Sequence, residues 1–136
     1  MRIIIVGAGK VGTNLAKDMA AKNHKVSLIE KNEAICSKLE KSDNLEIVCG
    51  DGCDPVVLEL AGIRAADIVA AATGDDEDNL VVAQLAKLQA NRPRVVSIIN
   101  NPRNAWLFNK SWGIDAAESP ASVVARLIEE DINKKI

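Results

Sequence analysis

The sequence predicts a single α/β domain built on a parallel sheet, and three observations predict it. Short runs rich in Ile and Val alternate along the chain with segments of helical period. These runs are continuously apolar, which is typical of strands that a parallel sheet buries on both faces. The length of 136 residues suits one domain with a proper core, so residues 1–136 are assigned to one unit.

Six apolar runs are expected to form strands, and each is followed by a helix candidate. They span Arg2–Val6, Lys25–Glu30, Leu45–Cys49, Asp67–Ala71, Arg94–Ile98 and Ile114–Ala116. Right-handed crossovers between six parallel strands produce a doubly wound sheet with helices on both faces, which is a three-layer αβα arrangement.

Apolar stripes and capping residues predict the helices. The stripes expected to face the sheet are Val11, Leu15 and Met19 in the first helix, Leu80, Val81, Gln84, Leu85 and Leu88 in the fourth, and Val123, Val124, Leu127, Ile128 and Ile132 in the last. Helix starts are indicated by Asn32, Asp54-Pro55 and Ser119-Pro120, and helix ends by Gly62 and Gly113.

Composition and charge exclude several classes of protein. The net charge is −2 and the basic residues are scattered, which argues against a nucleic-acid surface. The apolar runs are too short to cross a bilayer and no signal-peptide pattern is visible, so we expect a cytoplasmic protein without membrane insertion. Cys36, Cys49 and Cys53 contain no C-x-x-C pair, and we therefore expect reduced thiols and no metal site.

The first apolar run leads into Gly7-Ala8-Gly9-Lys10-Val11-Gly12 and then into a helix. In this context the G-x-G-x-x-G pattern indicates a dinucleotide-binding turn, and the fold is a Rossmann-type doubly wound parallel six-stranded sheet. Gly7 allows the tight turn, Gly9 leaves room for a pyrophosphate, and Gly12 lets the helix approach the strand. Helix-start amides attract phosphate. Lys10 either adds a cation there or is an ordinary solvated lysine.

Glu30 ends the second predicted strand. A carboxylate at this spacing accepts hydrogen bonds from both ribose hydroxyls and repels a 2′-phosphate. It favours NAD(H), as NADH or NAD+, or an adenosine nucleotide such as ATP or ADP, over NADP(H). The alternative is a strand-end charge paired with Lys31 or Lys25.

The turn after the third predicted strand is expected at the same edge of the sheet. Ligands of open α/β sheets collect outside the carboxyl ends of the strands, so Asp51 and Cys53 are candidates for the adenine side. A bare turn in which Asp54 caps the next helix would have a similar sequence.

The turn after the fourth predicted strand lies on the other side of the same cleft. Thr73 and Gly74 are expected to approach the nucleotide there. The acidic run 75–78 is suited to a divalent cation or to a helix start, and we favour the capping role.

Combinations of residues that perform catalysis are missing from the sequence. His24 is the single histidine and is predicted at the opposite edge of the sheet, and tyrosine is absent. A dehydrogenase also needs residues outside the cofactor domain to hold its substrate. We therefore expect a binding domain and not an enzyme, with the cofactor domain of an NAD-dependent dehydrogenase as the alternative.

Five segments, in order, resemble the regulatory nucleotide-binding domain of potassium transport systems, the TrkA N-terminal (KTN or RCK) family. They are IIIVGAGKVG, the acidic end of VSLIE, GDGCDPVVLELAGI, AATGDDEDNL and NNPRNAWLFNKSWGID…SP. The resemblance covers essentially the whole chain. It implies a cytosolic sensor that binds NAD(H), ATP or ADP, forms a homodimer and a ring, and regulates a membrane-embedded potassium transporter or channel. A regulator of another cation transporter or antiporter is the alternative.

Carried over by position, the resemblance implies contacts between the glycine turn and phosphates, between Glu30 and ribose, and between Asp51 with Cys53 and the adenosine end. Arg103 is a candidate for reaching phosphates at the cleft or at the dimer seam. Some relatives use a glutamate at the position of Ala121 to bind a cation, so no metal is expected here. The predicted cofactor-binding residues are Gly7, Ala8, Gly9, Lys10, Val11, Gly12, Glu30, Lys31, Asp51, Gly52, Cys53, Thr73, Gly74, Asp75, Asn79 and Arg103.

The resemblance also implies that the aromatic segment and the last predicted helix pack against a second subunit. Trp106, Phe108 and Trp112 are the only aromatic residues and lie within seven positions. With Leu107 they are expected at an interface, since aromatic residues are enriched in interface cores, and core packing is the alternative. The smaller C-terminal domain of full-length regulators is absent from the sequence, which indicates a minimal family member or a truncated chain.

Overall fold

Six strands form one parallel sheet in the order β3-β2-β1-β4-β5-β6 in the computed structural model, which describes residues 1–135. The strands are β1 (Arg2–Val6), β2 (Lys25–Glu30), β3 (Leu45–Cys49), β4 (Ile68–Ala71), β5 (Arg94–Ile98) and β6 (Ala116–Glu118). The order reverses between β1 and β4, which is the switch point of a doubly wound sheet. The predicted Rossmann-type fold is confirmed.

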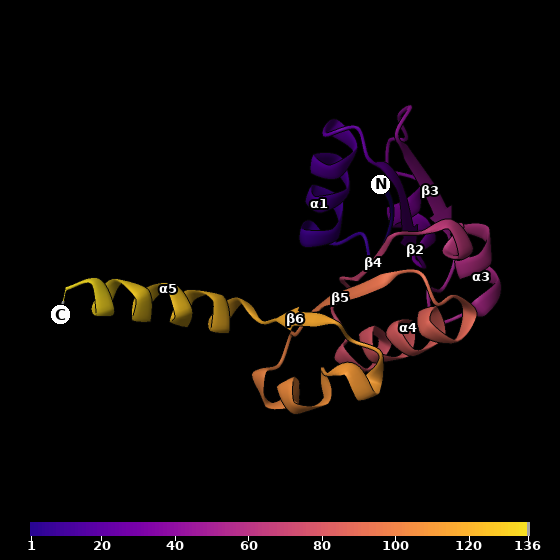
Figure 1. Ribbon diagram of the computed structural model, residues 1–136. Helices are drawn as coiled ribbons and strands as arrows, with labels where there is room; N and C mark the ends of the chain where they lie inside the picture. The colour runs from indigo at the N-terminus through magenta and orange to yellow at the C-terminus, as the bar shows by residue number, and fades with distance from the viewer. Residues whose placement is uncertain (136) are drawn as a thin grey trace.

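Helices lie on both faces of the sheet (Figure 1). α1 (Lys10–Ala21) covers one face, and α3 (Pro55–Leu60) and α4 (Asp76–Gln89) cover the other. Because side chains alternate along a strand, Ile3 and Ile5 pack on the α1 side while Ile4 packs on the α3 and α4 side. The remaining helical segments are α2 (Glu33–Cys36), α5 (Pro120–Lys134) and the 3₁₀ helices Ile63–Ala65, Pro102–Leu107 and Lys110–Trp112.

The capping predictions are confirmed. The side chain of Asn32 accepts a hydrogen bond from the Ile35 amide at the start of α2, and Asp54 accepts one from Val56 at the start of α3. Ser119 and Ser122 form a reciprocal capping box at the start of α5. The glycines at the predicted helix ends have left-handed backbone conformations, with φ of 90° at Gly62 and 83° at Gly113.

The stripe predicted for α1 is partly wrong. Its buried residues are Gly12, Ala16 and Ala20, whereas Val11 is 54% exposed. Leu15 and Met19 are partly buried at the edge of the contact. Small residues spaced by four bring the helix axis close to the sheet, and this close approach replaces the larger side chains that we expected to make the contact.

The stripe predicted for α4 is also partly wrong. Leu80 is buried as expected, but Val81 is 42% and Leu88 80% exposed. The residues buried in their place include Val82, Ala83 and Ala86. The contact is again centred on small side chains. Alanine contributes little to a hydrophobicity pattern, so the pattern did not identify this face.

The last predicted strand is displaced by two residues. Ile114 lies before β6 and is buried in the core, where its amide donates a hydrogen bond to the carbonyl oxygen of Asn109 (3.0 Å). Pairing with β5 begins at Asp115, whose amide donates to Val95 (2.9 Å). The apolar character of Ile114 therefore reflects its burial in the core and not a position in a β-strand.

α5 projects away from the sheet (Figure 1), so the prediction that its stripe packs on the sheet is wrong for this chain. None of its described residues is buried. The exposed fractions of Val124, Leu127, Ile128 and Ile132 are 53–55%. The helical periodicity of the sequence correctly identified an apolar face on α5, but it could not show which surface packs against that face. Among residues 1–135, no helix has the length and apolarity needed to cross a membrane.

Candidate functional site

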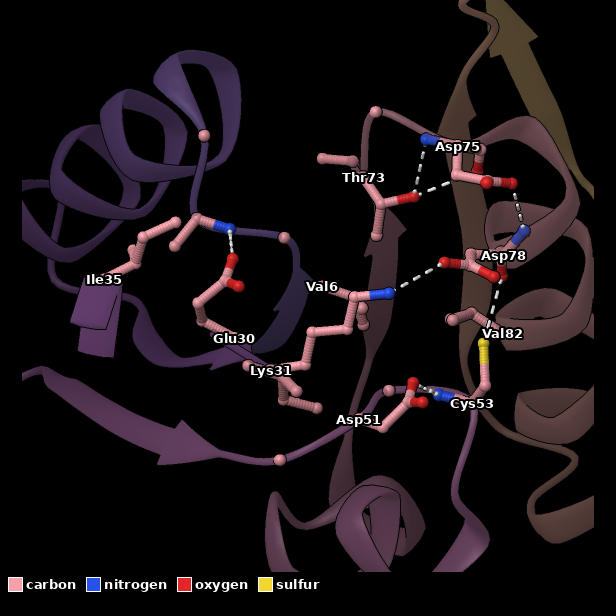
Figure 2. Close-up of a pocket in the computed structure, with 18 residues that line it drawn as sticks. Val6, Glu30, Lys31, Ile35, Asp51, Cys53, Thr73, Asp75, Asp78 and Val82 are labelled. Atoms are coloured by element: carbon pink, nitrogen blue, oxygen red, sulfur yellow. Dashed lines mark hydrogen bonds and ion pairs between the residues drawn. The ribbon is translucent and has the colours of Figure 1, made fainter. Parts of the chain in front are cut away.

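A cleft of about 380 Å³ opens at the carboxyl ends of the central strands, where the order of the sheet reverses (Figure 2). Ligands bind at this place in open α/β sheets. The residues that line it are Val6, Gly7, Ala8, Gly9, Ile29, Glu30, Lys31, Ile35, Gly50, Asp51, Gly52, Cys53, Ala72, Thr73, Gly74, Asp75, Asp78 and Val82.

The glycine turn, residues 7–12, forms one wall of the cleft. Gly7 has φ of 106°, and a Cβ there would lie 2.8 Å from the Ala72 carbonyl oxygen. A Cβ on Gly12 would lie 1.7 Å from the Gly7 carbonyl oxygen, so this position needs glycine for helix packing. Gly9 is the N-cap of α1, and a Cβ there would meet nothing within 4 Å. The turn therefore leaves open space in front of the first helical amides, where a phosphate is favoured.

Glu30 joins the glycine turn to the segment after β2. Its Oε1 accepts a hydrogen bond from the Ala8 amide (2.8 Å), and its Oε2 accepts one from the Asn32 amide (2.8 Å). The alternative of a strand-end ion pair with Lys31 or Lys25 is wrong within the described residues, because neither lysine lies within salt-bridge distance of this carboxylate. Each carboxylate oxygen has a second lone pair, so Glu30 can still accept from ribose hydroxyls.

Lys31 reaches across the cleft to the first turn of α4. Its Nζ lies 3.5 Å from Oδ2 of Asp78. The negative charge of Asp78 raises the pKa of Lys31, and the charge of Asp51 contributes in the same direction. Lys31 is thus held as a cation inside the lining of the cleft.

Asp51 and Cys53 form the turn after β3. Oδ1 of Asp51 accepts a hydrogen bond from the Cys53 amide (2.9 Å), and the thiol lies 3.8 Å from the Asp78 carbonyl oxygen. Burial, with the charges of Asp78 and Asp51, raises the pKa of Cys53 to about 12. The thiol therefore stays protonated at neutral pH and is a poor nucleophile.

Thr73 is positioned by a fully buried asparagine. The Thr73 amide donates to Oδ1 of Asn79 (3.0 Å), and the Asn79 side-chain amide donates to the Thr73 carbonyl oxygen (3.2 Å). Oδ1 of Asp75 accepts from the Asp78 amide (3.1 Å) and so caps α4, which agrees with the capping role favoured for the acidic run. Residues 1–135 contain no group of three His, Cys, Asp or Glu side chains arranged to hold a metal ion.

Asp76 has a different role from its acidic neighbours. It is buried and accepts hydrogen bonds from the backbone amides of Asn100 (2.7 Å) and Asn101 (2.9 Å) and from the Asn104 side chain (2.9 Å). Burial acts to raise the pKa of Asp76, but these hydrogen bonds outweigh it and hold the pKa below its usual range. The segment containing N-P-R-N is therefore attached to the start of α4 by one carboxylate. Sequence reasoning missed this contact.

Eleven of the sixteen predicted contact residues line the cleft, and five do not. Gly12 and Asn79 are buried behind the lining, where they shape the glycine turn and Thr73. Lys10 and Arg103 have exposed side chains outside it, as has Val11. The lining residues that sequence reasoning missed are Val6, Ile29, Ile35, Gly50, Ala72, Asp78 and Val82. For most of these the available signal was their position next to a predicted turn.

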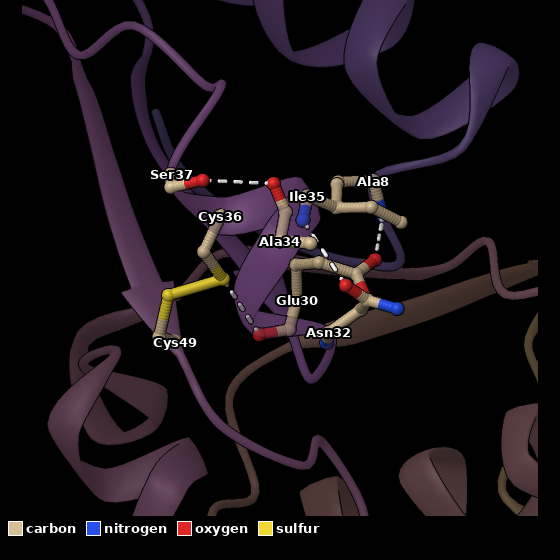
Figure 3. The surroundings of a disulfide bond; sticks show 8 residues. All are labelled: Ala8, Glu30, Asn32, Ala34, Ile35, Cys36, Ser37 and Cys49. Atoms are coloured by element: carbon tan, nitrogen blue, oxygen red, sulfur yellow. Dashed lines mark hydrogen bonds between the residues drawn. A yellow bond between two sulfur atoms is a disulfide. The ribbon is translucent and has the colours of Figure 1, made fainter.

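The expectation that all three cysteines are reduced thiols is wrong for two of them. Cys36 at the end of α2 and Cys49 at the end of β3 form a disulfide with a Cα–Cα distance of 6.1 Å (Figure 3). Cys49 is in register with Glu30 of the neighbouring strand, and α2 folds back over that strand end. The sheet register therefore brings together two residues that are 13 positions apart. Cys53 is free.

The aromatic cluster divides between core and surface. Phe108 is 9% exposed and packs in the core with partly buried Leu107, whereas Trp106 is 74% and Trp112 40% exposed. Core packing thus accounts for half of the cluster. The two tryptophans remain available at the surface.

Comparison with models of known protein families shows which family this chain belongs to. The TrkA-N domain model matches residues 3–120. The chain belongs to the TrkA-N domain family. The resemblance inferred from the five sequence segments is thereby confirmed.

Similar proteins are potassium uptake components. The Trk system potassium uptake protein TrkA of Mycobacterium tuberculosis is 38% identical over 97% of this chain and 60% of its own length. The TrkA homolog of Methanothermobacter thermautotrophicus is 35% identical over 98% of this chain and 61% of its own length. This TrkA-N chain therefore spans about three fifths of these relatives.

Solved structures share the fold. The TrkA-N domain of the inner membrane protein ybaL from Escherichia coli superposes with a TM-score of 0.82 at 16% identity, over 95% of this chain and 94% of that one. The GsuK channel bound to NAD superposes with a TM-score of 0.75 at 20% identity, over 86% of this chain and 21% of that one. The Kef C-terminal domain of Shewanella denitrificans in its AMP-bound form has a TM-score of 0.78 at 17% identity, over 98% of this chain and 80% of that one.

Proposed function

We propose that this TrkA-N chain is a regulatory, non-enzymatic component of a potassium uptake system on the cytoplasmic side of the membrane. It binds NAD(H), or an adenine nucleotide such as ATP or ADP, and its occupancy controls a membrane-embedded potassium transporter. Family membership and the names of the relatives support the transport role. The observation that carries the binding role is the cleft at the switch point, where the glycine turn and Glu30 lie side by side.

The cleft supports a nucleotide with one ribose at Glu30 and phosphates at the start of α1. Gly9 leaves open space at the N-cap, and the first turn of α1 contains no acidic residue that would repel phosphate. The hydrogen bond from Ala8 keeps the Glu30 carboxylate next to this turn. A 2′-phosphate at this position would meet the carboxylate charge, so NADH is preferred over NADPH.

A second copy of this chain is the proposed partner of α5. The helix exposes Val124, Leu127, Ile128 and Ile132 on one side. On the α1 side of the sheet, Val96 and Ile98 of β5 are only half-buried. Pairing of two copies through these surfaces buries both sets, and such dimers then assemble into a ring. A ligand changes the arrangement of the dimer only by binding one arrangement more tightly than the other.

Calorimetric titration of the purified chain with NADH, NAD+, NADPH, ATP and ADP tests the binding role. Binding of at least one of these below millimolar Kd is expected, with NADH tighter than NADPH. Glu30→Arg should remove that preference, because it replaces a repulsive charge by an attractive one. Glu30→Gln removes the charge but keeps one oxygen that can accept from the Ala8 amide. This variant therefore separates the effect of the charge from the effect of a disturbed glycine turn.

The regulatory role makes a separate prediction. Cells that depend on the cognate transporter should lose ligand-sensitive potassium uptake when Glu30 is changed, while the amount of transporter stays the same. Steady hydride turnover by the purified chain with simple alcohols or hydroxy acids would contradict a non-enzymatic role. Potassium uptake that stays ligand-sensitive after Glu30 is changed would contradict control by this site.

A further inference from the structure

Cys36 and Cys49 lie next to the adenosine side of the cleft, outside the set of residues predicted to contact the nucleotide. Ile35 precedes Cys36 and Gly50 follows Cys49, and both of these neighbours line the cleft. The carbonyl oxygen of Glu30 accepts a hydrogen bond from the Gly50 amide (2.9 Å). The same oxygen lies 3.1 Å from Sγ of Cys36 (Figure 3). Sγ of Cys36 is thus in direct contact with the backbone of the proposed ribose-binding residue.

The segment that the disulfide holds has few other attachments. α2 is one turn of four residues and contains no buried residue. It is held by the Asn32 cap, by the hydrogen bond from the Asn32 amide to Glu30, by the bond to Cys49 and by Ile35, which is 38% exposed. Segments with so little burial open at low free-energy cost, so one covalent bond has a large effect on their order.

We propose that Cys36 and Cys49 form a reversible thiol–disulfide site that fixes α2 against β3 and thereby raises the affinity of the cleft for nucleotide. The affinity part rests on the proposed function. In the disulfide, Ile35 and the Lys31–Asn32 segment are ordered before the ligand arrives. In the dithiol, the Cys36 thiol can only donate to the Glu30 carbonyl oxygen, and the ligand must order α2 itself.

Exchange with a low-molecular-weight disulfide supplies the chemistry. Cys49 is exposed and Cys36 half-buried, so the thiolate of Cys49 can attack the small disulfide, forming a mixed disulfide and releasing one small thiol. The Cys36 thiolate then attacks the Cys49 sulfur and releases the second small thiol. The small disulfide gains two electrons and both protons, and the cysteine pair loses them. Cys53 takes no part, because its thiol is partly buried in the cleft.

A reversible bond fits the proposed cytoplasmic setting. Disulfides in reducing compartments are mostly transient, catalytic or sensing. An exposed bond that closes a short loop next to a ligand cleft has the access that exchange requires, whereas a purely structural disulfide is usually shielded from small thiols.

The experiment uses the whole chain in buffers of fixed ratios of oxidised to reduced glutathione. After an acid quench and alkylation of the unfolded chain, mass spectrometry should show one two-electron transition, from three modified cysteines to Cys53 alone. Amide hydrogen exchange of residues 33–36 should be slower in the oxidised form. Cys36→Ser with Cys49→Ser should behave as the reduced form in every buffer, and Cys53→Ser should keep the transition.

Calorimetry with NADH on both redox forms tests the coupling. The oxidised form should bind about 5-fold more tightly or better, and NADH should favour disulfide formation by the same factor, because coupling is reciprocal. Stable glutathione adducts without the internal bond would overturn the redox site, and equal amide exchange in both forms would overturn the ordering of α2 by the disulfide. Equal Kd values would overturn the coupling. Failure of any nucleotide to bind either form would refute the proposed function, and the thiol titration and amide exchange would still decide the redox part.

Discussion

Lys31 and Asp78 face each other across the cleft, with the lysine Nζ 3.5 Å from a carboxylate oxygen (Figure 2). Lys31 follows β2 and Asp78 lies in the first turn of α4, so the pair joins the two halves of the sheet. Among the residues that line the cleft, Lys31 is the only cation, whereas four residues are acidic: Glu30, Asp51, Asp75 and Asp78. A phosphate entering the cleft therefore competes with Asp78 for Lys31.

Removal of the Asp78 charge should tighten nucleotide binding. Asp78→Asn keeps the shape of the side chain but frees Lys31 and lowers the negative charge of the cleft. We expect the Kd for NADH or ATP to fall about 5-fold at low salt, with a smaller gain at high salt because salt screens the charge. The free energy of unfolding should change by less than ~1 kcal/mol, since the ion pair is exposed. Calorimetry and denaturant unfolding measure the two quantities.

Glu77→Gln is the matched control for that change. Glu77 lies in the same first turn of α4 and is exposed outside the lining. The substitution removes the same charge from the same helix start, so it should leave the Kd nearly unchanged. An equal gain in affinity from Glu77→Gln would show that long-range charge, and not the pair with Lys31, limits binding.

Two glycines of the same turn should differ strongly in how much stability an alanine substitution costs. A Cβ at residue 12 meets the Gly7 carbonyl oxygen at 1.7 Å, so Gly12→Ala should lower the free energy of unfolding by about 3 kcal/mol. A Cβ at residue 9 meets nothing within 4 Å, and Gly9 has φ of −76°, so Gly9→Ala should change stability by less than ~1 kcal/mol. Urea unfolding of both variants checks this.

Gly9→Ala should nevertheless weaken nucleotide binding about 10-fold, because its methyl group occupies the space in front of the α1 amides. The stable variant is thus the informative one for function. Unchanged affinity in Gly9→Ala would place the phosphates away from the start of α1.

The fold was predictable because its signals are local. The runs that became β1, β2, β3 and β5 are rich in Ile, Val and Leu, and the caps at Asn32, Asp54 and Ser119 each depend on one side chain and its next few residues. The prediction for β6 failed because Ile114 is apolar for a reason other than strand formation. Its burial comes from a turn held by Asn109, and a hydrophobic run cannot distinguish the two.

The site was predictable where a motif carries its own geometry. The glycine turn, Glu30 and Thr73 each follow a strand end, and parallel topology brings such ends together. Asp78 and the Cys36–Cys49 bond were missed because they depend on which segments far apart in sequence become neighbours in space. Cys49 meets Cys36 only through the β2–β3 register and the fold-back of α2.

The buried carboxylate of Asp76 should make stability depend on acid pH. Its folded pKa is lowered, so its stabilising contribution is present above the unfolded pKa and is lost as pH falls through the folded value. Asp76→Asn should lower the free energy of unfolding by about 2 kcal/mol at pH 7, because one amide oxygen cannot replace two carboxylate oxygens for three asparagines. The difference from wild type should shrink below about pH 4. Urea unfolding at several pH values measures it, with Glu77→Gln as a control that should show no such convergence.

The apolar side of α5 should determine the oligomeric state. Leu127 is 53% exposed on the side shared with Val124 and Ile128, and Asn133 is exposed on the opposite side of the helix. Leu127→Glu places a charge in the proposed contact with a second copy, and burying it unpaired costs more than the contact returns. Sedimentation velocity at matched concentrations should show wild type and Asn133→Glu as dimers or larger and Leu127→Glu as a monomer. Both variants add the same charge to a helix with no buried residue. At concentrations low enough for both to be monomers, their free energies of unfolding should therefore be alike. A monomeric wild type, or a dimer that survives Leu127→Glu, would mean that α5 is covered by something other than a second copy of this chain.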